Sequence, residues 1–137
     1  MNWRKCEEEF IKRVEIDPDK IESIIKMCNA RKRIIDCAEI DDETASIIAS
    51  DYYEIMKELL IALLLKQGLK SNNHECLISF FRNKYPQYEY ETNSIHQLKD
   101  VRNRANYDGV FVKKEYVINN KLEFRHIIEL LERLVKC

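Results

Sequence analysis

The sequence predicts an all-α protein: an antiparallel up-and-down bundle of five to six helices, built as a single domain over residues 1–137. The length suits one hydrophobic core, because two cores would each be unusually small. The chain has only two glycines and two prolines, and a many-turned β-sandwich needs turn residues about every 8–12 positions. Apolar residues recur at helical spacing, and short connections make neighbouring helices antiparallel.

The N-terminal third contains one strong helix start. Residues 2–16 are charged and can form a short helix. Asp17 and Pro18 then combine an N-cap acid with a proline at the first helical position. Apolar residues at helical spacing continue from there to about Glu39. We therefore expect a long amphipathic helix in this region.

The next helix is predicted to be the most buried one. Asp41 or Asp42 opens it, and an acid suits the positive end of the helix dipole. From Leu59 onward the helix is apolar on every side, as in a helix enclosed by others. Gly68 is expected to end it, because a left-handed backbone conformation is common just past a helix C-terminus.

The second half of the chain predicts three more helices. Residues 86–91 are expected to form an aromatic, acidic loop, and residues 110–119 an extended connector. The expected bounds are Asn72 or Asn73 to Pro86 for the short helix, Thr92 or Asn93 to Gly109 for the next, and Asn119 or Asn120 onward for the last.

The charges are nearly balanced but unevenly placed. The net charge of −1 argues against a protein that grips nucleic acid over its whole surface. Residues 36–58 hold eight acids against one lysine, whereas residues 97–114 carry a net charge of +3. This leaves open a local anion site, the alternative being solvated helix faces of opposite sign.

The cysteines predict a cytoplasmic protein. There are five of them, an odd number with no Cys-x-x-Cys pair, and the N-terminus does not resemble a signal peptide. We expect free, mostly buried thiols in a reducing compartment. The longest apolar run, residues 59–65, is far shorter than the roughly 20 residues of a membrane span, so no membrane association is expected.

No metal or other cofactor is expected. The three histidines lack a His, Cys or carboxylate partner at a zincin-like spacing. His74 is interpreted as a residue at a helix start that offers hydrogen bonds. Neither a Gly-x-Ser-x-Gly motif nor a suggestive pair of carboxylates is present.

The most informative segment is 98–109, which contains Arg102. On a helical wheel one apolar stripe is formed by Ile95, Leu98, Val101 and Ala105. Arg102 lies about 45° from the centre of that stripe, so we expect it to be half-buried. A guanidinium keeps its charge and is costly to bury without a partner. The partner is a bound phosphate, backbone carbonyls, a second protomer or a carboxylate, with Asp51, Glu54 and Glu58 as the candidates for a structural ion pair.

Two blocks of sequence resemble the HEPN family of small helical domains. One is residues 50–77, with a tyrosine-rich helix, a glycine break and a helix that begins with a histidine. The other is residues 102–108, Arg-Asn-Arg-Ala-Asn-Tyr-Asp. The resemblance implies a homodimer in which the motif helices of two protomers meet across a cleft. Many members are metal-independent RNases, and many are toxins paired with a small nucleotidyltransferase antitoxin.

The match to the family's motif is incomplete. That motif is an arginine, a polar residue and, after four to six intervening residues, a histidine. Arg102 and Asn103 match its first two parts, but Tyr107 stands where the histidine is expected. The ordinary pKa of tyrosine is near 10, so about one molecule in a thousand is ionised at pH 7, a deficit of about 4 kcal/mol for a general base. Catalysis is therefore doubtful from the sequence.

Three functions remain open. The one we favour is a nucleotide- or RNA-binding interaction domain, with Arg102, Asn106, Arg104 and Lys99 as binding residues. The resemblance adds the option that it is half of a toxin–antitoxin-like pair. The alternatives are a metal-independent endoribonuclease that uses Arg102, Asn103 and Tyr107, and a non-catalytic scaffold. By resemblance alone, Tyr107 is also a candidate for modification with AMP by a nucleotidyltransferase partner. Its alternative role is packing at a helix end.

Overall fold

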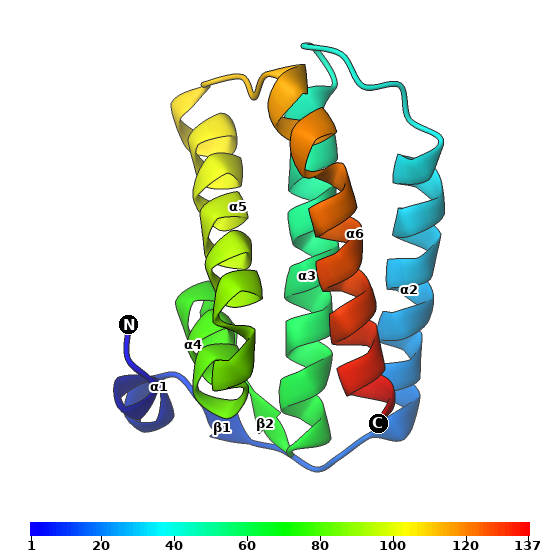
Figure 1. Ribbon diagram of the computed structural model, residues 1–137. Helices are drawn as coiled ribbons and strands as arrows, with labels where there is room; N and C mark the ends of the chain where they lie inside the picture. Colours follow the sequence, from blue (N-terminus) through cyan, green and yellow to red (C-terminus); the bar gives the residue numbers. More distant parts are fainter.

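The computed structural model describes residues 1–137 and confirms the all-α fold (Figure 1). Six α-helices are joined by short connections, with one 3-10 turn and one small two-stranded sheet. The elements in chain order are α1 (Trp3–Glu9), β1 (Lys12–Arg13), α2 (Pro18–Asp36), α3 (Ala45–Lys66), β2 (Leu69–Lys70), α4 (His74–Lys84), the 3-10 turn η1 (Pro86–Tyr88), α5 (Glu89–Asp108) and α6 (Lys114–Lys136).

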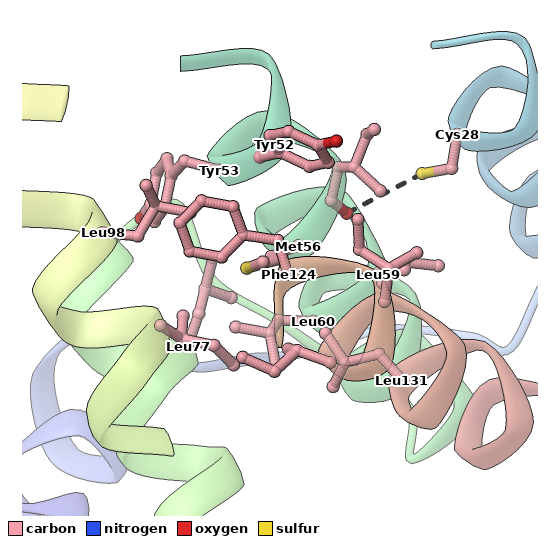
Figure 2. Packing of buried hydrophobic residues seen from close by; sticks show 14 of the residues in the cluster. Cys28, Tyr52, Tyr53, Met56, Leu59, Leu60, Leu77, Leu98, Phe124 and Leu131 are labelled. Atoms are coloured by element: carbon pink, nitrogen blue, oxygen red, sulfur yellow. Dashed lines mark hydrogen bonds between the residues drawn. The ribbon is translucent and has the colours of Figure 1, made fainter. Parts of the chain in front are cut away.

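Helix α3 is the centre of the bundle, as predicted. It packs against α2 and α6 on one side and against α4 and α5 on the other, as Figure 1 shows. Residues 62–65 are buried around the whole helix. Tyr52, Tyr53 and Leu59 are also enclosed, and their side chains form the middle of the core (Figure 2). The continuous apolar sequence of this helix is explained by neighbours on every side.

Several helix ends follow the predicted capping residues. The Asp17 carboxylate accepts hydrogen bonds from the backbone N–H groups of Asp19 and Lys20 at 3.1 and 3.2 Å, immediately before α2. Gly68 and Gly109 have φ angles of +71° and +67°, in the left-handed region that side chains disfavour. Both glycines therefore end their helices as predicted, and Gly68 does so through the left-handed conformation that was expected there.

Two predicted boundaries in the first half are wrong. Helix α2 ends at Asp36 rather than near Glu39. Helix α3 begins at Ala45, because the Asp41 carboxylate accepts hydrogen bonds from the backbone N–H groups of Glu43 and Thr44. Asp41 thus closes a turn before the helix instead of capping the helix itself.

Two predicted connectors in the second half are also shorter than expected. Within residues 86–91, Pro86 opens a 3-10 turn that leads directly into α5 at Glu89. Helix α6 begins at Lys114, not at residue 119 or 120, because Val117 packs into the core and the helix is needed to place it there. Only residues 109–113 link the two helices.

The pairing of β1 with β2 was not predicted. Lys12 pairs with Lys70 and Arg13 with Leu69 in an antiparallel register. Two-residue strands carry no alternating pattern, so the sequence holds no signal for them. The sheet brings the segment before α2 alongside the segment that follows α3, at the lower end of the bundle in Figure 1.

The prediction of free, mostly buried thiols is wrong. Cys6 and Cys76 form a disulfide across a sequence separation of 70 residues. Cys37 and Cys137 are free but exposed, and only Cys28 is both free and buried. The pairing arises because α1 packs on α4, a contact between helices far apart in the chain. The cytoplasmic location stays a prediction.

None of the helices combines the length and the hydropathy needed to cross a lipid bilayer.

Candidate functional site

Helix α5 presents the predicted apolar stripe to the core. Ile95 and Leu98 are buried, and Val101 and Ala105 are partly buried against the same cluster. Arg102 is half-buried at the edge of the stripe, as the helical wheel predicted. The core contacts of α5 therefore fix the direction in which this guanidinium leaves the helix, toward α3.

The Arg102 guanidinium is held without a carboxylate. Its Cζ atom lies 5.6 Å from the centre of the Tyr53 ring, a cation–π distance. Its Nη1 donates a hydrogen bond to Oδ1 of Asn103 at 3.0 Å. Glu54 and Glu58 instead bind Lys57, at 2.9 and 3.5 Å. Arg102 forms no salt bridge, so the predicted alternative of a structural ion pair is not seen, and the positive charge remains available.

A histidine that the motif reasoning set aside lies against the same tyrosine. The Tyr53 hydroxyl is 3.2 Å from Nδ1 of His74, the first residue of α4. Burial lowers the pKa of His74 below its usual value, and the nearby charges of Lys57 and Arg102 lower it further. The imidazole is therefore neutral at pH 7. Burial also raises the pKa of Tyr53, which stays protonated.

Sequence reasoning missed this arrangement because its members are far apart in the chain. Tyr53 and His74 are separated by 21 residues and come from different helices. The one local signal is Asn73, whose side chain caps α4 and fixes His74 as its first residue. Arg102, Tyr53 and His74 together are called the Arg102 cluster below.

Lys99 is placed differently from the other predicted binding residues. It is only 7% exposed, pairs with Glu75, and lies 3.7 Å from Asp100. Although burial alone would raise it, the pKa of Glu75 is held below its usual value by the hydrogen bond and the charge of Lys99. His96 joins the same group, 3.5 Å from Glu75. The charge of Lys99 is thus already balanced by neighbouring acids.

Three of the remaining predicted residues lie on the outer surface of α5, and the fourth, Asn106, lies beside α3. Asn103, Arg104 and Tyr107 line one shallow depression along the helix. Asn106 contacts Ser50 of α3, at 3.5 Å. Tyr107 is 74% exposed. Residues five apart on a helix point about 140° away from each other, so Tyr107 does not face the Arg102 cluster.

The arrangement is suited to binding an anion rather than a metal. No group of three or more His, Cys, Asp or Glu side chains is arranged to hold a metal ion. A half-buried guanidinium with an aromatic face behind it and an amide beside it has free N–H donors for an oxyanion.

Comparison with known proteins identifies no relative: no family model matches the chain, and no curated protein and no solved structure matches it. The resemblance to the HEPN family therefore rests on the two sequence blocks alone.

Proposed function

We propose that this protein is a nucleotide- or RNA-binding domain of the HEPN kind that holds a phosphate group at the Arg102 cluster. The observation that carries the proposal is the Arg102 guanidinium, half-buried beside Tyr53 and Asn103 and free of any carboxylate. A charge in this position is stabilised best by an anion that arrives from outside. The sequence resemblance agrees with this reading.

Phosphate is the anion that fits such a group. A guanidinium donates two parallel hydrogen bonds to phosphate oxygens, and the partly apolar surroundings strengthen them. Arg104 is exposed on another face of the same helix, where it adds positive charge that a longer RNA can reach. Tyr107, which faces away from the Arg102 cluster, offers an exposed ring on which a more distant base of an RNA can stack. We therefore assign phosphate recognition to Arg102, with weaker contributions from Asn103, Arg104 and Asn106.

Homodimerisation is the second part of the proposal. The end of α5 and the connector that follows expose three large apolar side chains: Tyr107 at 74%, Val110 at 56% and Phe111 at 68%. Exposed apolar groups that adjoin one another favour burial against a partner. Pairing of two copies through this end of α5 brings the motif helices of the two protomers close together. A nucleotidyltransferase-like partner that modifies Tyr107 would need the same exposed end, so its binding would compete with this pairing.

A second candidate function is metal-independent RNA cleavage, and His74 is the observation that favours it. A neutral imidazole can accept the proton of a ribose 2′-hydroxyl, which a tyrosine does poorly at pH 7. As the 2′-oxygen bonds to phosphorus and the bond from phosphorus to the 5′-oxygen breaks, the proton taken up is returned from the imidazolium to the 5′-oxygen. Arg102, which contacts Tyr53 as His74 does, would stabilise the negative charge on the phosphorane oxygens. In this candidate His74 replaces Tyr107 as the proton acceptor.

Binding is tested by fluorescence anisotropy with a labelled single-stranded RNA and with labelled AMP, each at low and at moderate salt. We expect Arg102→Ala to weaken binding about tenfold to a hundredfold, the range for a lost hydrogen-bonded charge pair. Arg102→Lys should restore part of the loss, because it keeps the charge without the planar fork. Arg33→Ala is the matched control, since Arg33 is exposed in the last turn of α2.

Two results would contradict the proposal. One is the absence of binding at low salt, where contacts to phosphate are strongest. The other is an equal effect of the Arg102 and Arg33 variants, which would indicate a purely non-specific charge contribution. Either result would favour the scaffold alternative.

Catalysis and assembly are tested separately. RNA cleavage in the presence of EDTA that is lost in both His74→Gln and Arg102→Ala, but kept in Arg33→Ala, supports the ribonuclease candidate. Binding without cleavage supports the binding domain alone. Sedimentation at micromolar concentration tests the dimer, which Phe111→Glu should dissociate, and a monomeric wild-type protein would contradict that part of the proposal.

A further inference from the structure

A pocket of about 290 Å³ is lined by residues of α2, α3 and α6, on the side of α3 that packs against α2 and α6 rather than against α4 and α5. Its apolar wall is formed by Ile35 of α2, Ile128 of α6 and the ring of Tyr52. At about 30 Å³ for a water molecule in the liquid, the volume corresponds to about ten waters. It therefore suits a small molecule rather than a polymer.

The pocket contains a hydroxyl group that lacks an acceptor. Tyr52 is 2% exposed, and its hydroxyl lies against the Arg125 guanidinium but donates to no acceptor. Buried hydroxyl groups are nearly always bonded, because losing water without a replacement is costly. Burial raises the pKa of Tyr52, so the hydroxyl stays protonated and can donate to an acceptor. In Figure 2 this hydroxyl points toward the side of α2, whereas the Tyr53 ring lies on the side of Leu98.

The rim of the pocket carries both signs of charge. Arg125 pairs with Asp36 at 2.6 Å, and Lys32 pairs with Glu132 at 3.0 Å. Glu129 also lines the pocket, is exposed and forms no salt bridge. A purely anionic ligand would be repelled by Asp36 and Glu129, and a purely cationic ligand would be repelled by Arg125 and Lys32. A ligand that carries both charges can satisfy both sets.

We propose that this pocket binds a small zwitterion with a short apolar body, that is, a free amino acid. Its carboxylate accepts hydrogen bonds from the Tyr52 hydroxyl and from Arg125, its ammonium group faces Glu129, and its side chain contacts Ile35 and Ile128. The Arg125–Asp36 pair is substantially exposed, so its rearrangement to admit the carboxylate costs little.

The test is a titration followed by amide chemical shifts, with each of the proteinogenic amino acids supplied singly at millimolar concentration. We expect at least one amino acid to shift the signals of residues 32–36 and 125–129. Its N-acetyl derivative, which lacks the cation, and its amide, which lacks the carboxylate, should each bind at least about tenfold more weakly. Failure of every amino acid, or equal binding of either derivative, overturns the proposal.

The Tyr52→Phe variant supplies the residue-level test. It removes only the hydroxyl, and since that group donates to no acceptor the variant should fold with little loss of thermal stability. Amino-acid affinity should fall about tenfold. Tyr85→Phe is the matched control, because Tyr85 lies at the end of α4, outside this pocket. The amino-acid affinity of this variant should equal that of wild type. Unchanged affinity in a folded Tyr52→Phe protein contradicts the assignment.

Discussion

The hydroxyl of Tyr53 lies 3.2 Å from Nδ1 of His74, and this contact ties the central helix α3 to the first residue of α4. Because the same tyrosine ring lies beneath the guanidinium of Arg102, one buried side chain organises the candidate site. Its neighbour Tyr52 is just as deeply buried, yet its hydroxyl donates to no acceptor.

The two adjacent tyrosines should respond differently to loss of their hydroxyl groups. Tyr53→Phe should lower the free energy of unfolding by about 1 kcal/mol, because it breaks a hydrogen bond to His74. Tyr52→Phe should lower it by less, because the Tyr52 hydroxyl lies against Arg125 but donates to no acceptor. Urea unfolding followed by circular dichroism measures both variants. Equal destabilisation of the two proteins would show that the Tyr52 hydroxyl donates to an acceptor in solution.

His74 should make the stability depend on pH below neutrality. Burial, with Lys57 and Arg102, holds its pKa in the folded protein below the value near 6.5 expected for the unfolded chain. Between these two pKa values the unfolded chain binds a proton that the folded protein does not. The free energy of unfolding should therefore fall as the pH falls below about 6.5, and His74→Gln should reduce this slope.

The measurement is urea unfolding at a series of pH values from 7.5 to 5.5. His126→Gln is the control, because His126 is an exposed histidine on α6. The control should keep the wild-type slope over this range. A His74→Gln protein whose slope equals that of wild type would contradict the prediction.

The disulfide should contribute strongly to stability. Cys6 and Cys76 are separated by 70 residues in the sequence, and closing a loop of this length is expected to stabilise the fold by about 4 kcal/mol. The Cys6→Ser/Cys76→Ser double variant should therefore unfold at lower urea concentration than wild type. Adding a reductant should destabilise wild type but not the double variant. Cys37→Ser, which removes an exposed free thiol, is the control and should behave as wild type.

The free thiols should fall into two reactivity classes. Cys37 and Cys137 are exposed and should react at once with a thiol reagent in the native protein. Burial raises the pKa of Cys28 to about 12, and its thiol donates to the carbonyl of Ile55 (Figure 2). Cys28 should therefore react only after unfolding. Mass spectrometry after alkylation identifies the labelled positions, and rapid native labelling of Cys28 would contradict the structure.

The two helix-ending glycines should differ in their tolerance of alanine. Both have positive φ, so each substitution is strained. At Gly68 a Cβ atom would also lie 3.1 Å from the carbonyl oxygen of Val14, whereas at Gly109 it would meet nothing within 4 Å. Gly109→Ala should cost about 1 kcal/mol and Gly68→Ala more, about 2 kcal/mol. Thermal unfolding compares the two, and the reverse order would contradict the explanation.

The sequence predicted correctly those features that depend on residues close together in the chain. The Asp17–Pro18 helix start, the helix-ending roles of Gly68 and Gly109, and the enclosure of α3 were all predicted and are confirmed. The half-burial of Arg102 followed from the same reasoning. Boundaries such as the start of α6 at Lys114 were less accurate, because core packing of Val117 extends a helix beyond its apparent cap.

The amino-acid sequence by itself thus determined the helical class, the order of the helices and which face of α5 meets the core. Only the tertiary structure decided that Cys6 meets Cys76, that Lys99 is neutralised by Glu75, and that Tyr53 lies between His74 and Arg102. The physical reason is the range of the interactions. Periodicity and capping depend on residues within one or two turns, whereas these contacts depend on how whole helices cross, which no local pattern encodes.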